Sequence, residues 1–230
     1  RFSAGDAAEA EDVVVRVASL KGPTTIGLVQ MMDTTSGIPT GEETEPAEAE
    51  KGSGISYFYS VSASPDEVLP KVIQGSADIA LVPSNAGAVL YNKTEGKVQV
   101  IDINTLGILY IVTGDEQVKS FADLAGKTVY ISGKGASPEY VFNYLLDKAG
   151  IADKVTVEWK SEHAELASVL ASDPTAVGVL PQPFVTATLA QNQDLSAPID
   201  LTQVWDEVVD DGSQSVTGIT VVLADFAAEH

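Results

Sequence analysis

The sequence predicts an α/β protein built from two mostly parallel sheets flanked by helices. Short β-branched or apolar runs alternate with segments of helical spacing along the 230 residues, which is typical of parallel sheets with helices on both faces. This alternation occupies residues 13–112 and begins again over 127–190. We therefore expect two lobes of similar build.

The strands of the first block are apolar runs bounded by turn residues. Residues 13–20 are β-branched and predict a strand buried on both faces. Further strands are predicted at 55–63 and 77–82. Residues 98–113 are too long for one strand of about five or six residues, so they predict two strands that cross between the lobes.

The helices of the first block should begin at Pro, Ser or Gly signals after each strand. They are expected at 23–33, at 64–75 and from 83–87 to about 96. Ser64, Pro65 and Glu67 have the spacing of a capping box, with Ser64 as the N-cap. Pro70 predicts a kink or a tightened turn inside this helix.

The second block repeats the pattern. Its strands are expected at 127–132, 155–160 and 176–180, and its helices at 137–150, 161–171, 184–191 and 201–209. Ser137 and Ser161 are predicted to cap their helices. A last strand at 217–223 precedes a helix start at 225–230, and we expect the protein to continue beyond it.

The composition indicates a globular protein with a large excess of acidic residues. Apolar residues make up 44%, and 13 basic against 33 acidic residues give a net charge of −20. This balance argues against nucleic acid or anionic membranes as partners, because phosphate binding needs clustered cations. Five glutamates between 42 and 50 lie in a segment, 36–54, that we interpret as a solvated insertion rather than a cation site. Residues 1–12 are interpreted as a spacer left after processing.

No catalytic motif is recognisable. The chain has no cysteine, which excludes thiolate metal sites and a Cys nucleophile, and its two histidines, His163 and His230, make a His-based metal site unexpected. His163 is interpreted as a solvated residue at a helix start, and there is no G-x-S-x-G. Residues 133–138 begin as G-x-G but lack the third glycine of a dinucleotide fingerprint, and residues 126–128 precede their strand and are interpreted as a turn. We predict no enzyme, no cofactor and no metal.

The candidate binding residues follow the carboxyl ends of the strands, where ligands bind in open α/β sheets. These loops are rich in small and polar residues and open several helices, so they present backbone N–H groups. The candidates are Lys21, Gly22, Pro23, Thr24, Thr25, Ser84, Asn85, Asn104, Gly107, Lys134, Gly135, Ala136, Ser137, Gln182 and Phe184.

The small number of basic residues in these loops limits the classes of ligand that they could bind. Arginine occurs only at Arg1 and Arg16, outside these loops, so a bidentate Arg clamp on a ligand is not expected. An anion held by N–H groups, hydroxyls and one lysine fits the loops, and so does a neutral polar or heteroaromatic ligand stacked on Phe184. Asp78 is interpreted as structural rather than catalytic.

Four phrases, at residues 20–24, 75–83, 121–129 and 135–139, together resemble the ABC-transporter solute-binding proteins of the nitrate/sulfonate/taurine and thiamine-precursor type. The most recurrent are G-x-x-D-I-A before Pro83 and D-L-x-G-K-x-V, which leads into the strand at 127–132. The resemblance implies a type II periplasmic-binding-protein fold, in which two lobes are joined by two crossing segments. It places lobe 1 at 13–112 plus 216–230 and lobe 2 at 113–215. The glutamate-rich segment departs from the usual pattern.

The resemblance also implies a function. An extracytoplasmic receptor would capture a small polar or anionic molecule, such as a sulfonate, nitrate or a pyrimidine-like compound, between two lobes by hinge closure. It would deliver this molecule to an ABC permease, as a monomer in the periplasm or at the cell surface, and a lipid anchor on a Cys outside this chain is a hypothesis. Two alternatives are an enzyme on the same fold, of the pyrimidine-precursor synthase or menaquinone-pathway type, and a ligand-sensing module of a larger receptor.

Overall fold

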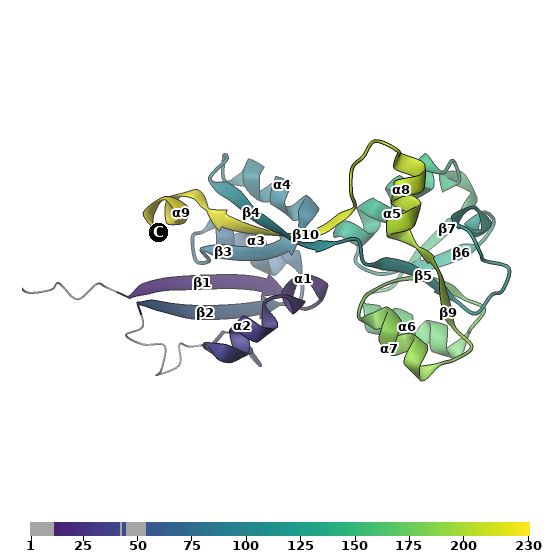
Figure 1. Ribbon diagram of the computed structural model, residues 1–230, viewed down its shortest axis with the longest axis horizontal. Coiled ribbons are helices and arrows are strands. Elements are labelled where there is room, and N and C mark those ends of the chain that lie inside the picture. Colours follow the sequence, from purple (N-terminus) through teal and green to yellow (C-terminus); the bar gives the residue numbers. More distant parts are fainter. Residues whose placement is uncertain (1–11, 42, 45–53) are drawn as a thin grey trace, which may run out of the picture. The chain divides into compact units, whose positions relative to one another are not determined.

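The computed structural model describes residues 12–41, 43–44 and 54–230 (Figure 1). The predicted spacer at 1–12 lies outside the described residues except for Asp12, and of the five glutamates only Glu43 lies within them. Glu43 makes an ion pair of 3.7 Å with the Lys71 ammonium.

The first sheet has five strands in the order β2-β1-β3-β10-β4. They are β1 (Val13–Leu20), β2 (Ile55–Ser62), β3 (Ile79–Pro83), β4 (Val98–Leu106) and β10 (Val216–Leu223). β1 pairs in parallel with both β2 and β3. β1 therefore lies inside the sheet, and residues 17–20 are buried on both faces as predicted, whereas Val14 near its start is 46% exposed.

The helices that accompany this sheet are short. They are α1 (Pro23–Ile26), α2 (Val29–Thr34), α3 (Pro65–Ile73), α4 (Ser84–Lys93) and α9 (Ala224–Glu229). The single helix predicted at 23–33 is wrong, because α1 ends before Gly27 and α2 begins at Val29. Thr24, Thr25 and Ile26 are β-branched and Gly27 follows them, so this segment has low helix propensity.

The second sheet has the order β7-β6-β8-β5-β9. Its strands are β5 (Leu109–Thr113), β6 (Thr128–Ile131), β7 (Thr156–Trp159), β8 (Val177–Pro181) and β9 (Ser196–Asp200). β6 is parallel to β7 and β8, whereas β5 is antiparallel to β8 and β9. The break between β4 and β5 confirms that 98–113 forms two strands, and β9 was not predicted.

Helices cover both faces of the second sheet (Figure 1). On one face, α5 (Ser137–Lys148) and α8 (Leu201–Val209) pack with the sheet around Phe142, Leu145 and Val204. On the other face, α6 (His163–Ser172) and α7 (Phe184–Gln191) pack around Leu166, Leu170 and Val185. Two short 3-10 turns, η1 (Phe121–Leu124) and η2 (Ala152–Lys154), complete this part.

The chain divides into two compact units. Unit 1 comprises residues 1–81, 90–99 and 221–230, and unit 2 comprises 82–89 and 100–220. The lobe boundaries given above remain a prediction. In the described part of the chain, no helix has the length and apolar character needed to cross a membrane.

An ion pair joins β1 to the turn before β3 in unit 1. The Asp78 carboxylate, only 5% exposed, accepts from the Arg16 backbone N at 2.8 Å, from Nε at 3.0 Å and from Nη2 at 2.6 Å. The Asp78 backbone N donates back to the Arg16 carbonyl at 2.8 Å. Asp78 is therefore structural, and the guanidinium of Arg16 is occupied by this ion pair.

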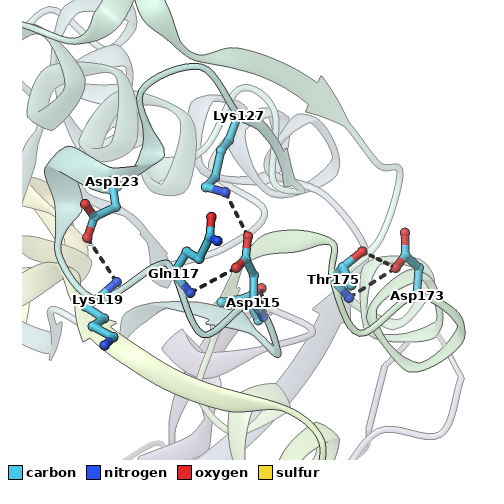
Figure 2. A network of polar contacts seen from close by, with 8 residues as sticks. Asp115, Gln117, Lys119, Asp123, Lys127, Asp173 and Thr175 are labelled. Atoms are coloured by element: carbon cyan, nitrogen blue, oxygen red, sulfur yellow. Dashed lines mark hydrogen bonds and ion pairs between the residues drawn. The ribbon is translucent and has the colours of Figure 1, made fainter.

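A polar network holds the turn that leads into β6 (Figure 2). Asp115 accepts from the Lys127 ammonium at 2.8 Å, and Asp123 accepts from the Lys119 backbone N at 3.1 Å. In the capping box of η1, Asp123 also accepts from the Ser120 hydroxyl at 2.8 Å. These hydrogen bonds lower the pKa of the Asp115 and Asp123 carboxyls. Lys127 therefore belongs to a turn, as predicted, and not to a phosphate loop.

Of the three predicted serine caps, the position of Ser64 is confirmed, whereas Ser137 and Ser161 are not N-caps. Ser64 is the N-cap of α3 but makes no side-chain cap bond, whereas Glu67 does accept from the Ala63 backbone N at 3.2 Å. The N-caps of α5 and α6 are Ala136 and Glu162, each one residue away from the predicted serine. Helix ends are uncertain by one or two residues from sequence, and a cap assignment depends on that single residue.

Candidate functional site

The loop after β1 places the first group of candidate residues in unit 1. The Lys21 backbone N donates to the Ser62 carbonyl at 2.9 Å, which joins this loop to the end of β2. Gly22 has φ 139°, a conformation that favours glycine. Thr24 and Thr25 are buried, and the Thr25 hydroxyl donates to the Leu20 carbonyl at 2.5 Å. These threonines thus support the loop from inside.

A cavity of about 260 Å³ lies at the carboxyl ends of β1 and β2. It is lined by Leu20, Lys21, Gly22, Thr25, Ile26, Val29, Met32, Ile38, Pro39, Thr40, Gly41 and Val61. Three predicted site residues are thus brought to one cavity. The segment 38–41 was not predicted as part of a site, because it belongs to the segment 36–54 that was interpreted as a solvated insertion; its residues 38–41 instead line this cavity. Mostly apolar walls with one ammonium group suit a small molecule that carries a negative charge.

Four candidates come together in unit 2. The Ser84 hydroxyl donates to the Val216 carbonyl at 2.7 Å, and the Ser137 hydroxyl donates to the Thr217 carbonyl at 2.8 Å. The two Oγ atoms lie 3.4 Å apart. Because each hydroxyl hydrogen is used on a carbonyl, both oxygens are left as acceptors.

Asn85 and Gly135 lie beside these serines. The Asn85 Nδ2 donates to the Gly135 carbonyl at 3.2 Å. Among the described residues, the Asn85 Oδ1 is enclosed and has no hydrogen-bond partner. An enclosed acceptor without a donor calls for a partner that the chain itself does not supply, such as a water or a ligand N–H.

Three other candidates are engaged within unit 2. The Asn104 Nδ2 donates to the Thr220 Oγ1 at 3.2 Å, between β4 and β10. The Gln182 Oε1 accepts from the Thr186 hydroxyl at 2.9 Å. The Lys134 ammonium lies 5.9 Å from the centre of the Trp159 ring.

Gly107 has a packing role, since a Cβ there would lie 2.1 Å from the Thr202 Oγ1. Pro23 begins α1, and Ala136 is the N-cap of α5.

His163 is placed differently from its prediction as a solvated residue. Its side chain is half-buried, and its Nδ1 lies 2.5 Å from the Oγ of Ser132, a residue only 1% exposed. The ring centre lies 5.2 Å from that of Phe184. Burial lowers the pKa of the His163 imidazole below its ordinary value of 6.5, and the charge of Glu162 opposes this shift. The imidazole is therefore neutral near pH 7.

The three residues of this His163 cluster come from neighbouring strand ends. Ser132 follows β6, His163 begins the helix after β7, and Phe184 begins the helix after β8. Because β7, β6 and β8 are adjacent and parallel, their carboxyl ends meet at one edge of the second sheet. The signal that could have found Ser132 was its position directly after an apolar strand.

The described residues contain no group of three or more His, Asp or Glu that could hold a metal ion. The His163 imidazole makes its hydrogen bond to Ser132, and among the described residues no carboxylate bonds to it. The arrangement thus lacks the acid that orients the base in a Ser-His-Asp triad.

Two five-stranded α/β sheets with polar loops at their carboxyl edges define the fold of the type II periplasmic binding proteins. Solved structures share this fold. An ABC transporter from Parabacteroides distasonis has a TM-score of 0.69 and 21% identity, over 92% of this chain and 66% of that one. The periplasmic aliphatic sulphonate binding protein SsuA from Escherichia coli has a TM-score of 0.66 and 15% identity, over 94% and 67%.

A third structure, the alkanesulfonate-binding protein SsuA from Xanthomonas axonopodis bound to MOPS, has a TM-score of 0.58 and 14% identity, over 96% and 68%. The chain thus spans about two thirds of the length of these structures. The profile of the family described as NMT1/THI5 like matches residues 51–173, more than half of the chain. The chain belongs to this family, as its sequence phrases predict. No curated protein matches the chain.

Proposed function

We propose that this chain is an extracytoplasmic solute-binding receptor that binds a small polar or anionic molecule and delivers it to an ABC importer. Its partners are this solute and a membrane permease, and it acts as a monomer in the periplasm or at the cell surface, with hinge closure on the solute. The proposal assigns it no catalytic role.

The cavity at the ends of β1 and β2 is the observation that carries the proposal. Its walls are mostly apolar, and Lys21 is the one charged residue among those that line it. A sulfonate with a short apolar body matches both features, because the charge meets the ammonium while the body is removed from water. The SsuA proteins from Escherichia coli and Xanthomonas axonopodis bind compounds of this class, which supports the choice.

Binding also suits the polar groups of unit 2 better than catalysis does. The hydroxyl hydrogens of Ser84 and Ser137 are held by backbone carbonyls, and no base is bonded to either hydroxyl. Ser132 does meet a histidine but is only 1% exposed. A nucleophile must reach its substrate, so this pair does not form an activated serine.

Thermal unfolding of the full chain against a panel of ethanesulfonate, MOPS, nitrate and a pyrimidine tests the proposal. A ligand at 100 times its Kd adds about 2.7 kcal/mol to the unfolding free energy. At about 2–4 °C per kcal/mol for a chain of this size, the midpoint should rise by roughly 5–11 °C.

The variant Lys21→Met should reduce the shift caused by an anionic ligand, and Lys93→Met is the matched control. Lys93 is an exposed lysine in the last turn of α4, outside the cavity. A panel that leaves the midpoint of the wild type unchanged argues against a solute receptor. If the ligand raised the unfolding midpoint equally in both variants, Lys21 would not contribute to binding.

A further inference from the structure

The His163 cluster offers a hydrogen-bond donor whose identity follows from hydrogen counting. Ser132 has one hydroxyl hydrogen, and the Nδ1 of His163 is the only partner that its Oγ has among the described residues. The side chain of Ser132 is enclosed, so water does not take that hydrogen.

Two tautomers of a neutral imidazole could fill this contact. If Nδ1 carried the proton and donated to Oγ, the enclosed hydroxyl hydrogen would have no acceptor, which is disfavoured by roughly tenfold or more. If the hydroxyl donates to Nδ1, every group is satisfied and the ring proton is on Nε2. The structure therefore favours the Nε2–H tautomer of His163.

The Nε2 atom reaches solvent. It has no hydrogen-bond partner within the described part of the chain, and it is not among the enclosed side-chain atoms that lack one, of which the Asn85 Oδ1 is the single case. Phe184 packs beside the ring and limits its rotation. The second sheet thus presents, at its carboxyl edge, an oriented and uncharged N–H donor.

We propose that His163 donates its Nε2–H to an oxygen of a solute held at the carboxyl edge of the second sheet, with Ser132 fixing the tautomer and Phe184 fixing the orientation of the ring. The solute then carries an accepting oxygen, as a sulfonate, carboxylate or carbonyl does. This inference rests on the proposed receptor function and adds to it a recognition residue of unit 2 that was not among the sequence candidates.

The tautomer is measured first, without any ligand. Long-range ¹H–¹⁵N spectra of the full chain at pH 7.5 show two histidines, and His230→Gln assigns them by removing one set of signals. We expect about 90% or more of the Nε2–H form at His163, the population that a tenfold preference gives. In Ser132→Ala this preference should be lost. A wild-type ring protonated at Nδ1 would overturn the proposal.

Binding is measured next by calorimetry, with ethanesulfonate and acetate as the probes. His163→Leu should weaken binding by about 10- to 150-fold, the range for a hydrogen bond to a charged group. His163→Gln, whose amide N–H can reach the place of Nε2, should recover most of the loss, and His230→Gln should bind as the wild type does. Circular dichroism confirms that each variant is folded.

The outcomes separate the two proposals. Wild-type affinity in His163→Leu overturns the role of His163 and leaves the receptor function standing. Absence of binding of both probes to the wild type argues against a receptor for sulfonates and carboxylates. The tautomer measurement tests whether Nε2 carries the proton, and its result does not depend on either binding experiment.

Discussion

Replacing Asp78 by Asn removes the charge from the carboxylate that holds Arg16 in unit 1. The Asn Oδ1 can still accept, but its Nδ2 must face an N–H of the guanidinium or of the backbone. At least one charge-assisted bond is lost, from the three that measure 2.6–3.0 Å. Such a bond contributes about 1.5–3 kcal/mol.

The exposure of the two partners sets the size of the effect. Asp78 is 5% exposed, so its replacement leaves polar groups that water does not reach easily. The Arg16 side chain is 43% exposed and can turn partly to water, which places the loss below the 3–5 kcal/mol of a fully enclosed pair. We expect Asp78→Asn to lower the unfolding free energy by about 2–3 kcal/mol, and the midpoint by roughly 4–12 °C.

Far-ultraviolet circular dichroism during urea unfolding is the suitable assay. Both tryptophans, Trp159 and Trp205, lie in unit 2, so their fluorescence would not report the unfolding of unit 1. The midpoint in urea should fall with little change in slope. Asp102→Asn is the control, because Asp102 is exposed on β4, and it should stay within about 0.5 kcal/mol.

A double-mutant cycle with Arg16→Met isolates the pair. If the pair is responsible, Asp78→Asn should have a smaller effect in the Arg16→Met background, with a coupling of about 1 kcal/mol or more. A cycle without coupling, or an Asp78→Asn midpoint equal to that of the control, would refute the reasoning.

Three further predictions follow from individual contacts. Gly107→Ala places a Cβ 2.1 Å from the Thr202 Oγ1 and should destabilise the protein by about 1–3 kcal/mol; thermal unfolding measures this, and Thr202→Ala in the same chain should restore part of the loss. Burial lowers the pKa of His163 below 6.5, so the unfolded state binds more protons between the two values. The unfolding free energy should therefore fall as the pH decreases from 6.5 through the folded-state pKa, and urea titrations of His163→Gln should lack this slope. Lys127→Met removes the hydrogen bond that chiefly lowers the pKa of Asp115, so a carboxyl NMR titration should show that pKa moving up toward 3.8, and an unchanged value would contradict the assignment.

The regular elements were predictable where the local pattern and the sheet agree. β1 lies at the predicted residues because a β-branched run favours an interior strand of a parallel sheet, and β1 is such a strand. β9 was not predicted because its residues 196–200 include Pro198, and a proline in a short segment indicates a loop rather than a strand. In the fold β9 is an edge strand next to β5, and a proline is tolerated there because one side of the strand needs no ladder bond.

The capping serines show why single-residue roles were harder to predict. The motif around Ser137 predicts a helix start, and α5 does begin there. The hydroxyl nevertheless donates to the carbonyl of Thr217, 80 residues away, rather than to its own helix. A local pattern fixes the backbone but not the distant acceptor that a hydroxyl finds after folding.

The candidate site follows the same logic. Strand ends are visible in a sequence, and for that reason Lys21, Ser84 and Ser137 could be named as candidates. Whether a polar group at a strand end remains available to a ligand depends on the partners that the fold gives it. Ser137 uses its hydrogen on a carbonyl, whereas the burial of one side of His163 against Ser132 leaves the other side as a donor with a fixed tautomer. A histidine that looks unremarkable beside its sequence neighbours thus becomes, through one buried hydroxyl, the donor at the carboxyl edge of the second sheet.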